Sequence, residues 1–373
     1  MRILLTCHVR FASALAWYAY HLARGLRSAG HDVYLSSQRG SPLAEWARTA
    51  GIPGTDQFDY HSANPLHLAQ AVRQLRRVVR EYEPDVLNAH CPPGHALLAW
   101  VNSGRRPLIR TAAEPRSPRN NAVNRFIHER RTDGLIYSTA TSAVRYAQVF
   151  SLTRVAQQVI YPGLDLSLFP ETAFANWRQR LSVPDDALFA AVVARMSPEK
   201  GQEKLIEALA LLEPGVRSRI VVLLTGDDNR QRTWRDLELL AQQKGVASSL
   251  RFASRLDDVR PLLSEIDLGV ITSLRSEAVC RIALEYMAYG KPVITSDVNI
   301  LPEVVRHDDT GWVFPSQEPA RLAWLLERAT TERAALRDMG ERGRARLESE
   351  FTLAGMTERT IAYYQQVLAR HGR

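Results

Sequence analysis

Short apolar runs alternate with amphipathic segments along the chain, and this alternation predicts strands that alternate with helices. Residues 2–6 read as a buried strand, and residues 14–29 have the apolar spacing of an amphipathic helix that ends at Gly30. Further strands are predicted at residues 32–36, 84–90, 107–111 and 134–139, and a further helix at residues 66–82. Strands and helices in this order favour a parallel α/β sheet.

The alternation pauses at residues 160–165, where Pro162 and Gly163 break regular structure, and we place a hinge at about residues 162–187. Strand patterns then resume at residues 188–194, 219–225, 250–253, 268–272 and 292–295. The last stretch, residues 351–370, is again helical in pattern. The chain is therefore expected to form an α/β protein of two doubly wound domains, residues 1–165 and 188–350, followed by a helical segment at residues 351–373. Such sheets bind ligands beyond the carboxyl ends of their strands, so two facing domains would share a cleft.

The composition is that of an ordinary globular protein, with 45% hydrophobic and 24% charged residues among 373. No apolar stretch approaches the roughly 20 residues of a membrane span, and the first apolar run is too short for a signal peptide. Cys7, Cys91 and Cys280 are scattered, which indicates neither a disulfide framework nor a metal cluster. We expect a reduced, cytoplasmic protein.

The net charge of +8 is concentrated in the first half of the chain. Residues 1–165 contain 20 arginines, no lysine and 11 acidic residues, whereas the remainder carries a net charge of −1. Four arginines recur at helical spacing opposite an apolar face of Leu68, Val72, Leu75 and Val79; they are Arg73, Arg76, Arg77 and Arg80. Two interpretations stay open, a solvated face or attraction to an anionic partner such as an acidic membrane surface or a charged acceptor. No motif for binding nucleic acid appears.

Two glutamates eight residues apart, Glu277 and Glu285, follow a predicted strand and precede a Gly-Lys-Pro turn. We expect Glu277 at the mouth of a helix and Glu285 two turns inside it, about 12 Å apart. The free N–H groups of residues 278–281 would form a helix N-terminus that can bind phosphate. Two hydroxyl-binding carboxylates beside an anion site predict a nucleotide-sugar pocket, although the same pair also suits an exposed acidic face.

A second candidate lies after the first strand of the second half, where Arg195 and Lys200 stand five residues apart and Gly201 precedes a helix. Two cations in a strand-loop-helix junction can hold a diphosphate together with the helix N-terminus. The spacing of a Walker loop is missing. The alternative is a surface loop with ordinary charges.

Together these runs resemble the E-x7-E and R-x4-K-G motifs of retaining GT-B glycosyltransferases of family 4. Other segments resemble that family in order: residues 162–165 with Phe169, the turn at Gly226, residues 252–256 where the family packs the nucleobase, and residues 311–315. The resemblance covers nearly the whole chain. It implies a GT-B fold of two Rossmann-like domains, with a terminal helix that crosses back to the first domain. It also implies sugar transfer to an acceptor hydroxyl with retained configuration, and no catalytic metal.

The resemblance assigns roles to individual residues. Arg195 and Lys200 would stabilise the leaving diphosphate, Glu277 would hold sugar hydroxyls, and Glu285 would hold the ribose diol. The remaining donor contacts implied are Ala278, Val279, Cys280, Arg281, Gly226 and Arg255. Ala278 and Cys280 stand where the family usually has glycine, and Arg281 replaces an apolar residue.

The acceptor side departs further from the family. The loop at residues 8–13 has no glycine, and residues 110–116 replace a segment that often carries a histidine. Candidate acceptor contacts are His8, Arg10, His90, Glu114 and Arg116, each with the alternative of a structural histidine or a surface charge.

The expected donor is a UDP- or GDP-linked sugar, and the expected acceptor is a glycan or lipid-linked glycan in cell-surface polysaccharide or lipopolysaccharide assembly. The protein would be cytoplasmic, with peripheral attachment to the inner face of the membrane as a second possibility. The alternatives are a non-catalytic sugar-nucleotide-binding or scaffold relative and a GT-B nucleotide-sugar epimerase.

Overall fold

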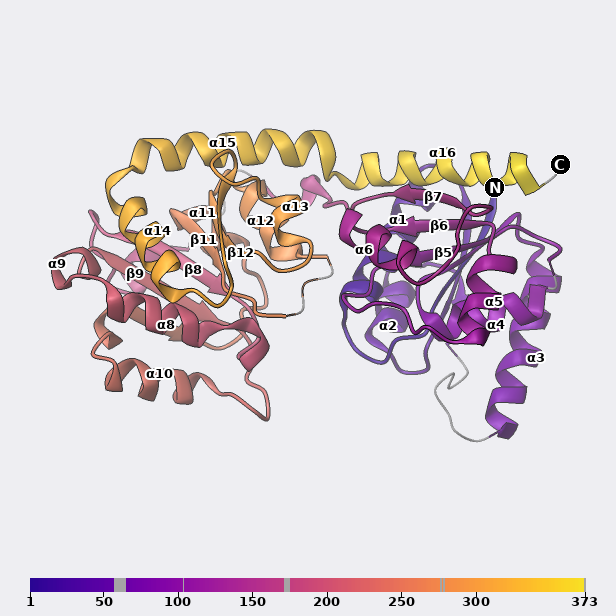
Figure 1. Cartoon of the computed structure of the whole chain (residues 1–373), viewed down its shortest axis with the longest axis horizontal. Coiled ribbons are helices and arrows are strands. Elements are labelled where there is room, and N and C mark those ends of the chain that lie inside the picture. The colour runs from indigo at the N-terminus through magenta and orange to yellow at the C-terminus, as the bar shows by residue number, and fades with distance from the viewer. Residues whose placement is uncertain (57–64, 103, 171–174, 276, 278, 372–373) are drawn as a thin grey trace. The chain divides into compact units, whose positions relative to one another are not determined.

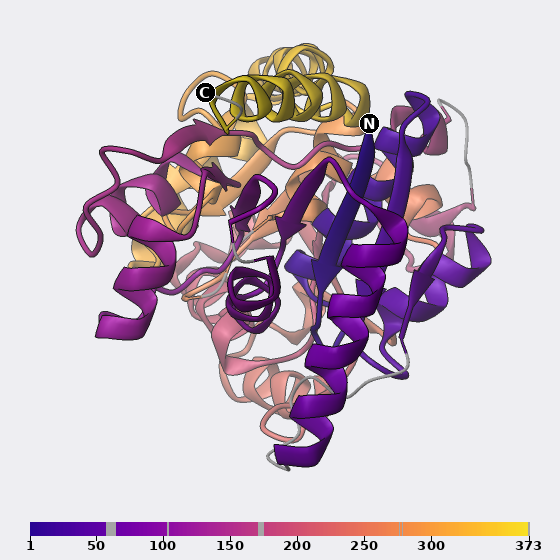
Figure 2. The same cartoon turned by 90° about the vertical axis from the view of Figure 1, so that its right-hand side faces the viewer.

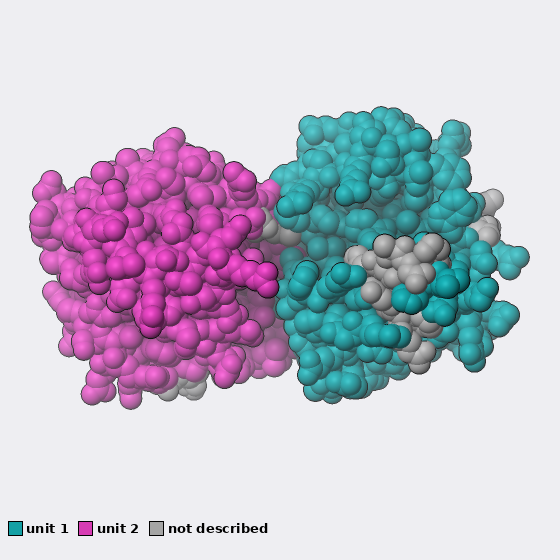
Figure 3. All heavy atoms as spheres, turned by 90° about the horizontal axis from the view of Figure 1, so that it is seen from below, with its two compact units in different colours: residues 1–163, 351–373 teal, residues 164–350 magenta. Residues whose placement is uncertain are grey.

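A computed structural model describes residues 1–56, 65–102, 104–170, 175–275, 277 and 279–371 (Figure 1). The chain divides into two compact units, coloured separately in Figure 3. The first unit comprises Met1–Gly163 and Phe351–Arg373, and the second comprises Leu164–Glu350.

The first unit is built on a parallel sheet of seven strands in the order β3-β2-β1-β4-β5-β6-β7. Its strands are β1 (Arg2–Cys7), β2 (Asp32–Ser37), β3 (Gly54–Thr55), β4 (Val86–Ala89), β5 (Leu108–Ala112), β6 (Gly134–Tyr137) and β7 (Ala156–Val159). The order reverses at β1, which pairs with both β2 and β4, and such a reversal is where doubly wound sheets bind ligands.

Helices cover both faces of this sheet, as Figure 2 shows. They are α1 (Ala14–Ser28), α2 (Pro42–Thr49), α3 (Pro65–Tyr82), α4 (Pro92–Asn102), α5 (Ala122–Arg130), α6 (Ala140–Ala147) and α16 (Leu353–His371). Side chains alternate between the faces of a strand, so Ile3 and Leu5 pack with α1, α2 and α16, whereas Leu4 packs with α3 and α4.

The terminal helix α16 is fixed to the first unit by buried tyrosines. The Tyr363 hydroxyl donates to the carbonyl oxygen of Ala156 at 2.7 Å, and the Asn88 amide donates to the Tyr364 hydroxyl at 2.5 Å. The helix also packs closely on α1, where a Cβ at Gly25 would lie 2.0 Å from the Thr357 hydroxyl. The last helix therefore returns to the first domain, as the fold class implies.

The second unit is built on a parallel sheet of six strands in the order β10-β9-β8-β11-β12-β13. The strands are β8 (Leu188–Val193), β9 (Ile220–Thr225), β10 (Leu250–Ala253), β11 (Leu268–Ile271), β12 (Val293–Ser296) and β13 (Gly311–Phe314). Its longer helices are α8 (Gln202–Leu211), α10 (Trp234–Gln243), α12 (Arg281–Ala288), α14 (Pro319–Thr331) and α15 (Arg333–Glu350). Its short helices and turns are η1 (Leu166–Leu168), α7 (Trp177–Arg180), η2 (Pro198–Lys200), α9 (Pro214–Arg217), η3 (Ala247–Ser249), α11 (Arg260–Glu265) and α13 (Leu301–Val304). This order also reverses at the first strand, β8, so both units are doubly wound.

The strands and the two early helices predicted from the apolar pattern are confirmed. The edge strand β7 was not predicted, because its sequence Ala-Gln-Gln-Val is only partly buried and lacks an apolar run. Leu68 was predicted on the apolar face of α3 but is 43% exposed; the buried face consists of Ala71, Leu75, Val78 and Val79.

Much of the segment that the sequence marks as a hinge is folded within the second unit, where η1 and α7 form. The N-terminus of α7 is stabilised by Glu265, whose carboxylate accepts the N–H groups of Ala175 and Trp177 at 2.6 Å each.

Candidate functional site

The loops that follow β8 and β11 are locked together at the carboxyl edge of the second sheet. Gly201 has a φ of +65°, and a Cβ there would lie 2.1 Å from the carbonyl oxygen of Thr272. The Thr272 hydroxyl donates to the Lys200 carbonyl oxygen at 2.8 Å, and the Leu274 N–H donates to the Glu199 carbonyl oxygen at 2.8 Å. Only glycine satisfies both the backbone angle and the close approach, so the Lys-Gly pair fixes this junction.

A third loop, after β9, joins the same edge. Gly226 has a φ of +153°, and a Cβ there would lie 2.1 Å from the carbonyl oxygen of Ala194. The Met196 N–H donates to the Asp227 carbonyl oxygen at 2.8 Å. Gly226 therefore allows the loops after β8 and β9 to approach each other closely. This gives a structural reason for a glycine at a position that was predicted to contact the donor.

Lys200 and Glu277, predicted from separate motifs, form an ion pair at this edge. Their side chains are 23% and 11% exposed. The Ser273 hydroxyl donates to Oε1 of Glu277 at 2.6 Å, and the Ser296 hydroxyl donates to the carbonyl oxygen of Ser273 at 2.6 Å. Glu277 is therefore held by a cation and a hydroxyl. The two serines whose hydroxyls form this chain of hydrogen bonds, Ser273 and Ser296, were not identified from the sequence; the available signal was a small polar residue at or just after the end of each strand.

Arg195 lies beside this pair in the chain, on the loop after β8, and is exposed. Its carbonyl oxygen accepts the side-chain amide of Gln202 at 3.0 Å, which orients the loop. Over the described part of the chain, no carboxylate lies within ion-pair distance of its guanidinium. Arg195 is thus a cation available to an anionic ligand.

Helix α12 begins at Arg281, so the expectation of a helix running from residue 278 is wrong. Cys280, the N-cap, has a left-handed φ of 45°, and its carbonyl oxygen accepts the Ala283 N–H at 3.1 Å. Glu285 consequently lies at the start of the second turn, and the helix offers its first amides from Arg281 onward. Val279 is buried, whereas Ala278 lies outside the described residues.

Glu285 is 3% exposed and forms an ion pair with Arg281, whose side chain is largely in solvent. Burial raises the pKa of this carboxyl, and the neighbouring Arg281 guanidinium lowers it. Burial also raises the pKa of the Cys280 thiol well above its usual value, which keeps the thiol protonated and unsuited to nucleophilic attack.

Arg255, predicted near the nucleobase, lies in the loop after β10. Its Nη1 is 3.4 Å from Oδ2 of Asp227, and both side chains are mostly exposed. The Thr225 hydroxyl donates to the carbonyl oxygen of Ser254 at 2.7 Å, which ties the ends of β9 and β10. Arg255 therefore lies on a fourth loop of the same edge.

In the first unit, His8 and His90 lie at the carboxyl ends of β1 and β4, and both are buried. Nε2 of His8 is 3.2 Å from the Ser36 hydroxyl, and its backbone N–H donates to Sγ of Cys91 at 3.1 Å. Burial, together with the nearby Arg110 guanidinium, lowers the pKa of His90 to about 3. His90 is therefore a neutral imidazole at physiological pH.

Glu114 forms an ion pair with Arg110, a fully buried residue that sequence reasoning did not assign a role. Arg110 Nη1 also donates to the carbonyl oxygen of Ala89 at 3.0 Å. The signal was an arginine inside an otherwise apolar strand. Arg10 and Arg116, the other predicted acceptor-side residues, are exposed.

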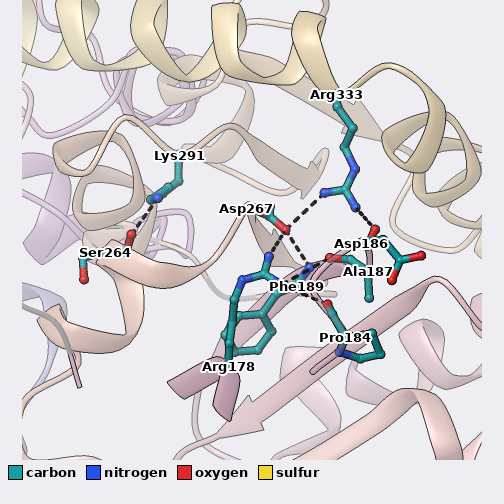
Figure 4. Close-up of polar contacts among 9 residues, drawn as sticks. All are labelled: Arg178, Pro184, Asp186, Ala187, Phe189, Ser264, Asp267, Lys291 and Arg333. Atoms are coloured by element: carbon teal, nitrogen blue, oxygen red, sulfur yellow. Dashed lines mark hydrogen bonds and ion pairs between the residues drawn. The ribbon is translucent and has the colours of Figure 1, made fainter. Parts of the chain in front are cut away.

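A different polar cluster of the second unit, shown in Figure 4, lies at the opposite, amino-terminal ends of β8, β11 and β12. Oδ2 of Asp267 accepts from Arg178 Nη2 at 2.6 Å and from Arg333 Nη1 at 3.1 Å. Lys291 Nζ donates to the Ser264 carbonyl oxygen at 2.9 Å. The cluster borders a hollow of about 410 Å³, but these contacts tie segments of the unit together and are not at the ligand-binding edge.

The described residues include no group of three or more His, Cys, Asp or Glu side chains placed to hold a metal ion. Across the same described ranges, no helix is both long and apolar enough to cross a bilayer.

Two family models match the chain. The model described as "Glycosyl transferases group 1" matches residues 173–346, and the model described as "Glycosyltransferase Family 4" matches residues 15–168.

Curated proteins resemble the chain over different lengths. The D-inositol 3-phosphate glycosyltransferase of Actinosynnema mirum is 30% identical over 289 residues, which cover 71% of this chain and 69% of that protein. The protein of the same name from Streptomyces scabiei is 31% identical over 211 residues, 53% of this chain and 46% of the relative. The chain thus spans about half the length of the first curated relatives it matches, at 46% and 49%.

Among solved structures, Anabaena Alr3699/HepE in complex with UDP has a TM-score of 0.86 to this chain at 20% sequence identity. The match covers 98% of this chain and 100% of that chain. The same protein has been solved in complex with UDP-glucose. At this level of identity the likeness is one of fold.

Proposed function

The chain belongs to the group 1 glycosyltransferases of family 4, with a GT-B fold, and on that premise we propose that it moves a sugar from a nucleotide diphosphate sugar to an acceptor hydroxyl with retention of configuration. The observation that carries the proposal is the ion pair between Lys200 and Glu277. This pair brings the two charged motifs together at the carboxyl edge of the second sheet, where ligands of such sheets bind.

Departure of the nucleoside diphosphate leaves negative charge on its phosphates, and Lys200 with the exposed Arg195 would stabilise that charge in the transition state. Lys200 is paired with Glu277 in the structure. An entering diphosphate would therefore displace the Glu277 carboxylate from the Lys200 ammonium group. Glu277, still held by the Ser273 hydroxyl, would then accept hydrogen bonds from the donor sugar.

Glu285 would accept hydrogen bonds from the ribose hydroxyls, and Arg281 would favour the ionised form of this buried carboxyl. The remaining donor contacts proposed are Val279, Cys280, Gly226 and Arg255, together with Ala278. In this scheme the protein cations neutralise the diphosphate, and no step requires a divalent metal.

UDP is the first nucleotide to test as the donor's nucleotide part, because UDP and UDP-glucose are bound in the structures of Alr3699/HepE. GDP is the second. The scheme does not depend on the base, since it rests on diphosphate, ribose and sugar contacts.

On the acceptor side, Arg10 and Arg116 are the first residues to test, because both are exposed. His8 and His90 would contribute as buried hydrogen-bonding groups, with His90 as a neutral imidazole, and Glu114 is held by Arg110. The proposed acceptor is a glycan or lipid-linked glycan of cell-surface or lipopolysaccharide assembly. The reaction would take place in the cytoplasm, with the cationic first half of the chain favouring the anionic inner face of the membrane.

A melting-temperature screen tests the donor half of the proposal. The protein is heated with UDP, GDP, ADP, CMP and their common sugar conjugates, in magnesium and in EDTA. A ligand at about 100 times its Kd stabilises the folded state by about 2.7 kcal/mol. A shift with one base in EDTA is expected, whereas a shift only in magnesium contradicts the metal-free scheme. No shift with any base would favour a non-catalytic scaffold.

Product analysis tests the reaction. With the selected donor and candidate glycan acceptors, NMR of the product should show the anomeric configuration of the donor. Conversion of the donor into its epimer without an acceptor would instead identify an epimerase.

A further inference from the structure

A cationic hollow of about 430 Å³ lies in the first unit between the second half of α3 and the turn after α4. Val79, Val101 and Asn102 contribute to its lining, and Glu83 is its acidic member. The basic lining residues are Arg73, Arg76, Arg77, Arg80, Arg105 and Arg106. We call this hollow, with its six arginines, the arginine groove.

The arginine groove is at the amino-terminal edge of the first sheet. Helix α3 ends at Tyr82, just before β4 begins at Val86, and the turn with Arg105 and Arg106 precedes β5 at Leu108. The candidate acceptor residues His90 and Glu114 follow the carboxyl ends of the same two strands. The groove is therefore separate from the expected sugar-transfer site.

One wall of the groove is a turn held in place by a buried amide. Asn102 is 4% exposed; its Nδ2 donates to the Arg106 carbonyl oxygen at 2.6 Å, and its Oδ1 accepts the Arg106 N–H at 3.1 Å. The Arg105 N–H donates to the Asn102 carbonyl oxygen at 3.1 Å. The backbone that carries these two arginines is thus fixed before any ligand arrives, which reduces the entropy cost of binding.

The other wall is a stripe of arginines on α3 at positions i, i+3, i+4 and i+7, which lie on one helix face. The helix is packed on the first unit through the buried residues Ala71, Leu75, Val78 and Val79, of which Val79 also borders the groove. Like charges at i and i+4 repel each other, so the stripe disfavours the isolated helix, and packing of the unit does not need it.

Few of these positive charges are neutralised by the protein. Arg77 pairs with Glu81, and the Glu83 carboxylate lies 3.6 Å from Arg2. For the other five arginines, no carboxylate within the described ranges lies at ion-pair distance. The polar cluster of Figure 4 differs, because Arg178 and Arg333 there share the Asp267 carboxylate.

We propose that the arginine groove is a binding site for a compact polyanion that carries two or more phosphate groups. Guanidinium groups bind phosphate through paired N–H donors, and a concave site with several of them favours clustered phosphates over a single charge. The phosphates could belong to a soluble polyphosphate or to the headgroup of a phospholipid, and the two sources share the same recognition chemistry. This site is additional to the proposed sugar transfer and does not depend on it.

Calorimetric titration with inorganic tripolyphosphate tests the proposal. Two groove variants are compared with the wild type: Arg76→Gln with Arg80→Gln, and Arg105→Gln with Arg106→Gln. The matched control is Arg48→Gln with Arg154→Gln, which removes the same charge from exposed positions outside the groove. Any binding at the donor site is common to all four proteins.

Both groove variants should bind tripolyphosphate at least about 10-fold more weakly than the wild type, and the control should bind as tightly as the wild type. Because the substituted side chains are in solvent or at the groove surface, thermal melting should show all variants folded. Equal affinity in all four proteins, or an equal loss in the control, would overturn the proposal.

Sedimentation with vesicles identifies the source of the phosphates. Vesicles of phosphatidylcholine with a minor fraction of cardiolipin present headgroups that carry two phosphates each, on a surface with a screening length of about 8 Å at physiological salt. Groove-dependent sedimentation together with groove-dependent tripolyphosphate binding assigns a lipid headgroup, and tripolyphosphate binding alone assigns a soluble ligand. Vesicle binding without tripolyphosphate binding would contradict a compact site and indicate a diffuse charged surface.

Discussion

The carboxyl edges of the two sheets handle charge in opposite ways. In the second unit, glycines let three loops approach at the backbone, and the exposed Arg195 and partly exposed Lys200 remain accessible. In the first unit, the corresponding edge contains two buried histidines, His8 and His90, and an ion pair between the fully buried Arg110 and Glu114, whose side chain is 20% exposed. The edge proposed to bind a diphosphate has accessible cations, whereas the first edge uses the buried Arg110 to hold its own loop.

The glycine content of the loops accounts for part of this difference. Gly201 and Gly226 replace side chains where backbone meets backbone, so backbone contacts help to hold these loops of the second unit together. The loop after β1, residues 8–13, contains no glycine, and its first side chain, His8, is buried against Ser36. The comparison leads to predictions in which the same kind of substitution has different effects in the two units.

The largest effect is expected for Glu114→Gln, which leaves the buried Arg110 guanidinium without its carboxylate. Breaking a buried pair in this way should reduce the free energy of unfolding by about 3–5 kcal/mol. The control is Glu81→Gln, which breaks an Arg-Glu pair of the same i, i+4 spacing in solvent and should cost about 0.5 kcal/mol or less. Urea unfolding measures both; equal small losses would show that the first edge is not held by this pair.

Glu277→Gln should mainly affect turnover. Loss of the ionised carboxylate removes the partner of Lys200 and the proposed acceptor for sugar hydroxyls, and misplacement of the sugar should lower kcat by about 100-fold. Glu199→Gln changes an exposed carboxylate next to Lys200 and serves as the control. Steady-state kinetics with the donor selected by the melting screen measure this effect. If both variants turn over like the wild type, Glu277 is not part of the site.

Gly201→Ala should destabilise the second unit more than Gly245→Ala does. Both glycines have a positive φ, which costs about 1–2 kcal/mol for alanine, but a Cβ at Gly245 meets no atom within 4 Å. The overlap with the Thr272 carbonyl should add about 1–3 kcal/mol at Gly201. Urea unfolding of both variants isolates the cost of loop contact; equal losses would show that the loops are not locked.

The smallest effect is a shift in pH dependence for Arg281→Ala. Burial raises the pKa of Glu285 and Arg281 lowers it, so removal of the guanidinium should raise this pKa further. Glu285 then loses its charge at a higher pH during acidification, and donor affinity should fall at a higher pH than in the wild type. Arg281→Lys should largely restore the wild-type profile, and an unchanged acid limb in Arg281→Ala would argue against ribose binding by ionised Glu285.

The sign of the stability effect follows from the same shift. A carboxyl whose pKa is raised by folding binds its proton more tightly in the folded state, so the stability it contributes falls as pH rises through its folded pKa. Arg281→Ala should move this fall to higher pH, which urea unfolding across the pH range would detect.

Much of the fold follows from the sequence because buried parallel strands are continuous apolar runs, as residues 188–193 and 220–225 illustrate. The edge strand β7 was not predicted because two of its four residues are glutamines and only Ala156 is buried. The start of α12 was misplaced because Cys280 adopts a left-handed conformation, which is uncommon for residues other than glycine and is not predicted from the sequence.

The candidate site was only partly predictable. Lys200 and Glu277 were recognised by spacing within separate motifs. The two residues are 77 positions apart in the sequence, and their contact depends on the pairing of β8 with β11. The hydroxyl chain through Ser273 and Ser296 has no sequence pattern of its own. Arg110 carried a signal, a charge inside an apolar strand, whose meaning depends on the partner that the fold supplies.

Titration calorimetry in EDTA tests most directly whether the locked loops of the second unit bind the donor diphosphate. The wild type, Lys200→Ala and Lys204→Ala are titrated with the nucleoside diphosphate that the melting screen selects. Lys204 pairs with Glu207 on α8 and loses the same charge. Lys200→Ala should weaken binding by about 1.5–3 kcal/mol, roughly 10- to 150-fold, and Lys204→Ala should leave it unchanged. Equal affinity in all three folded proteins would contradict the account.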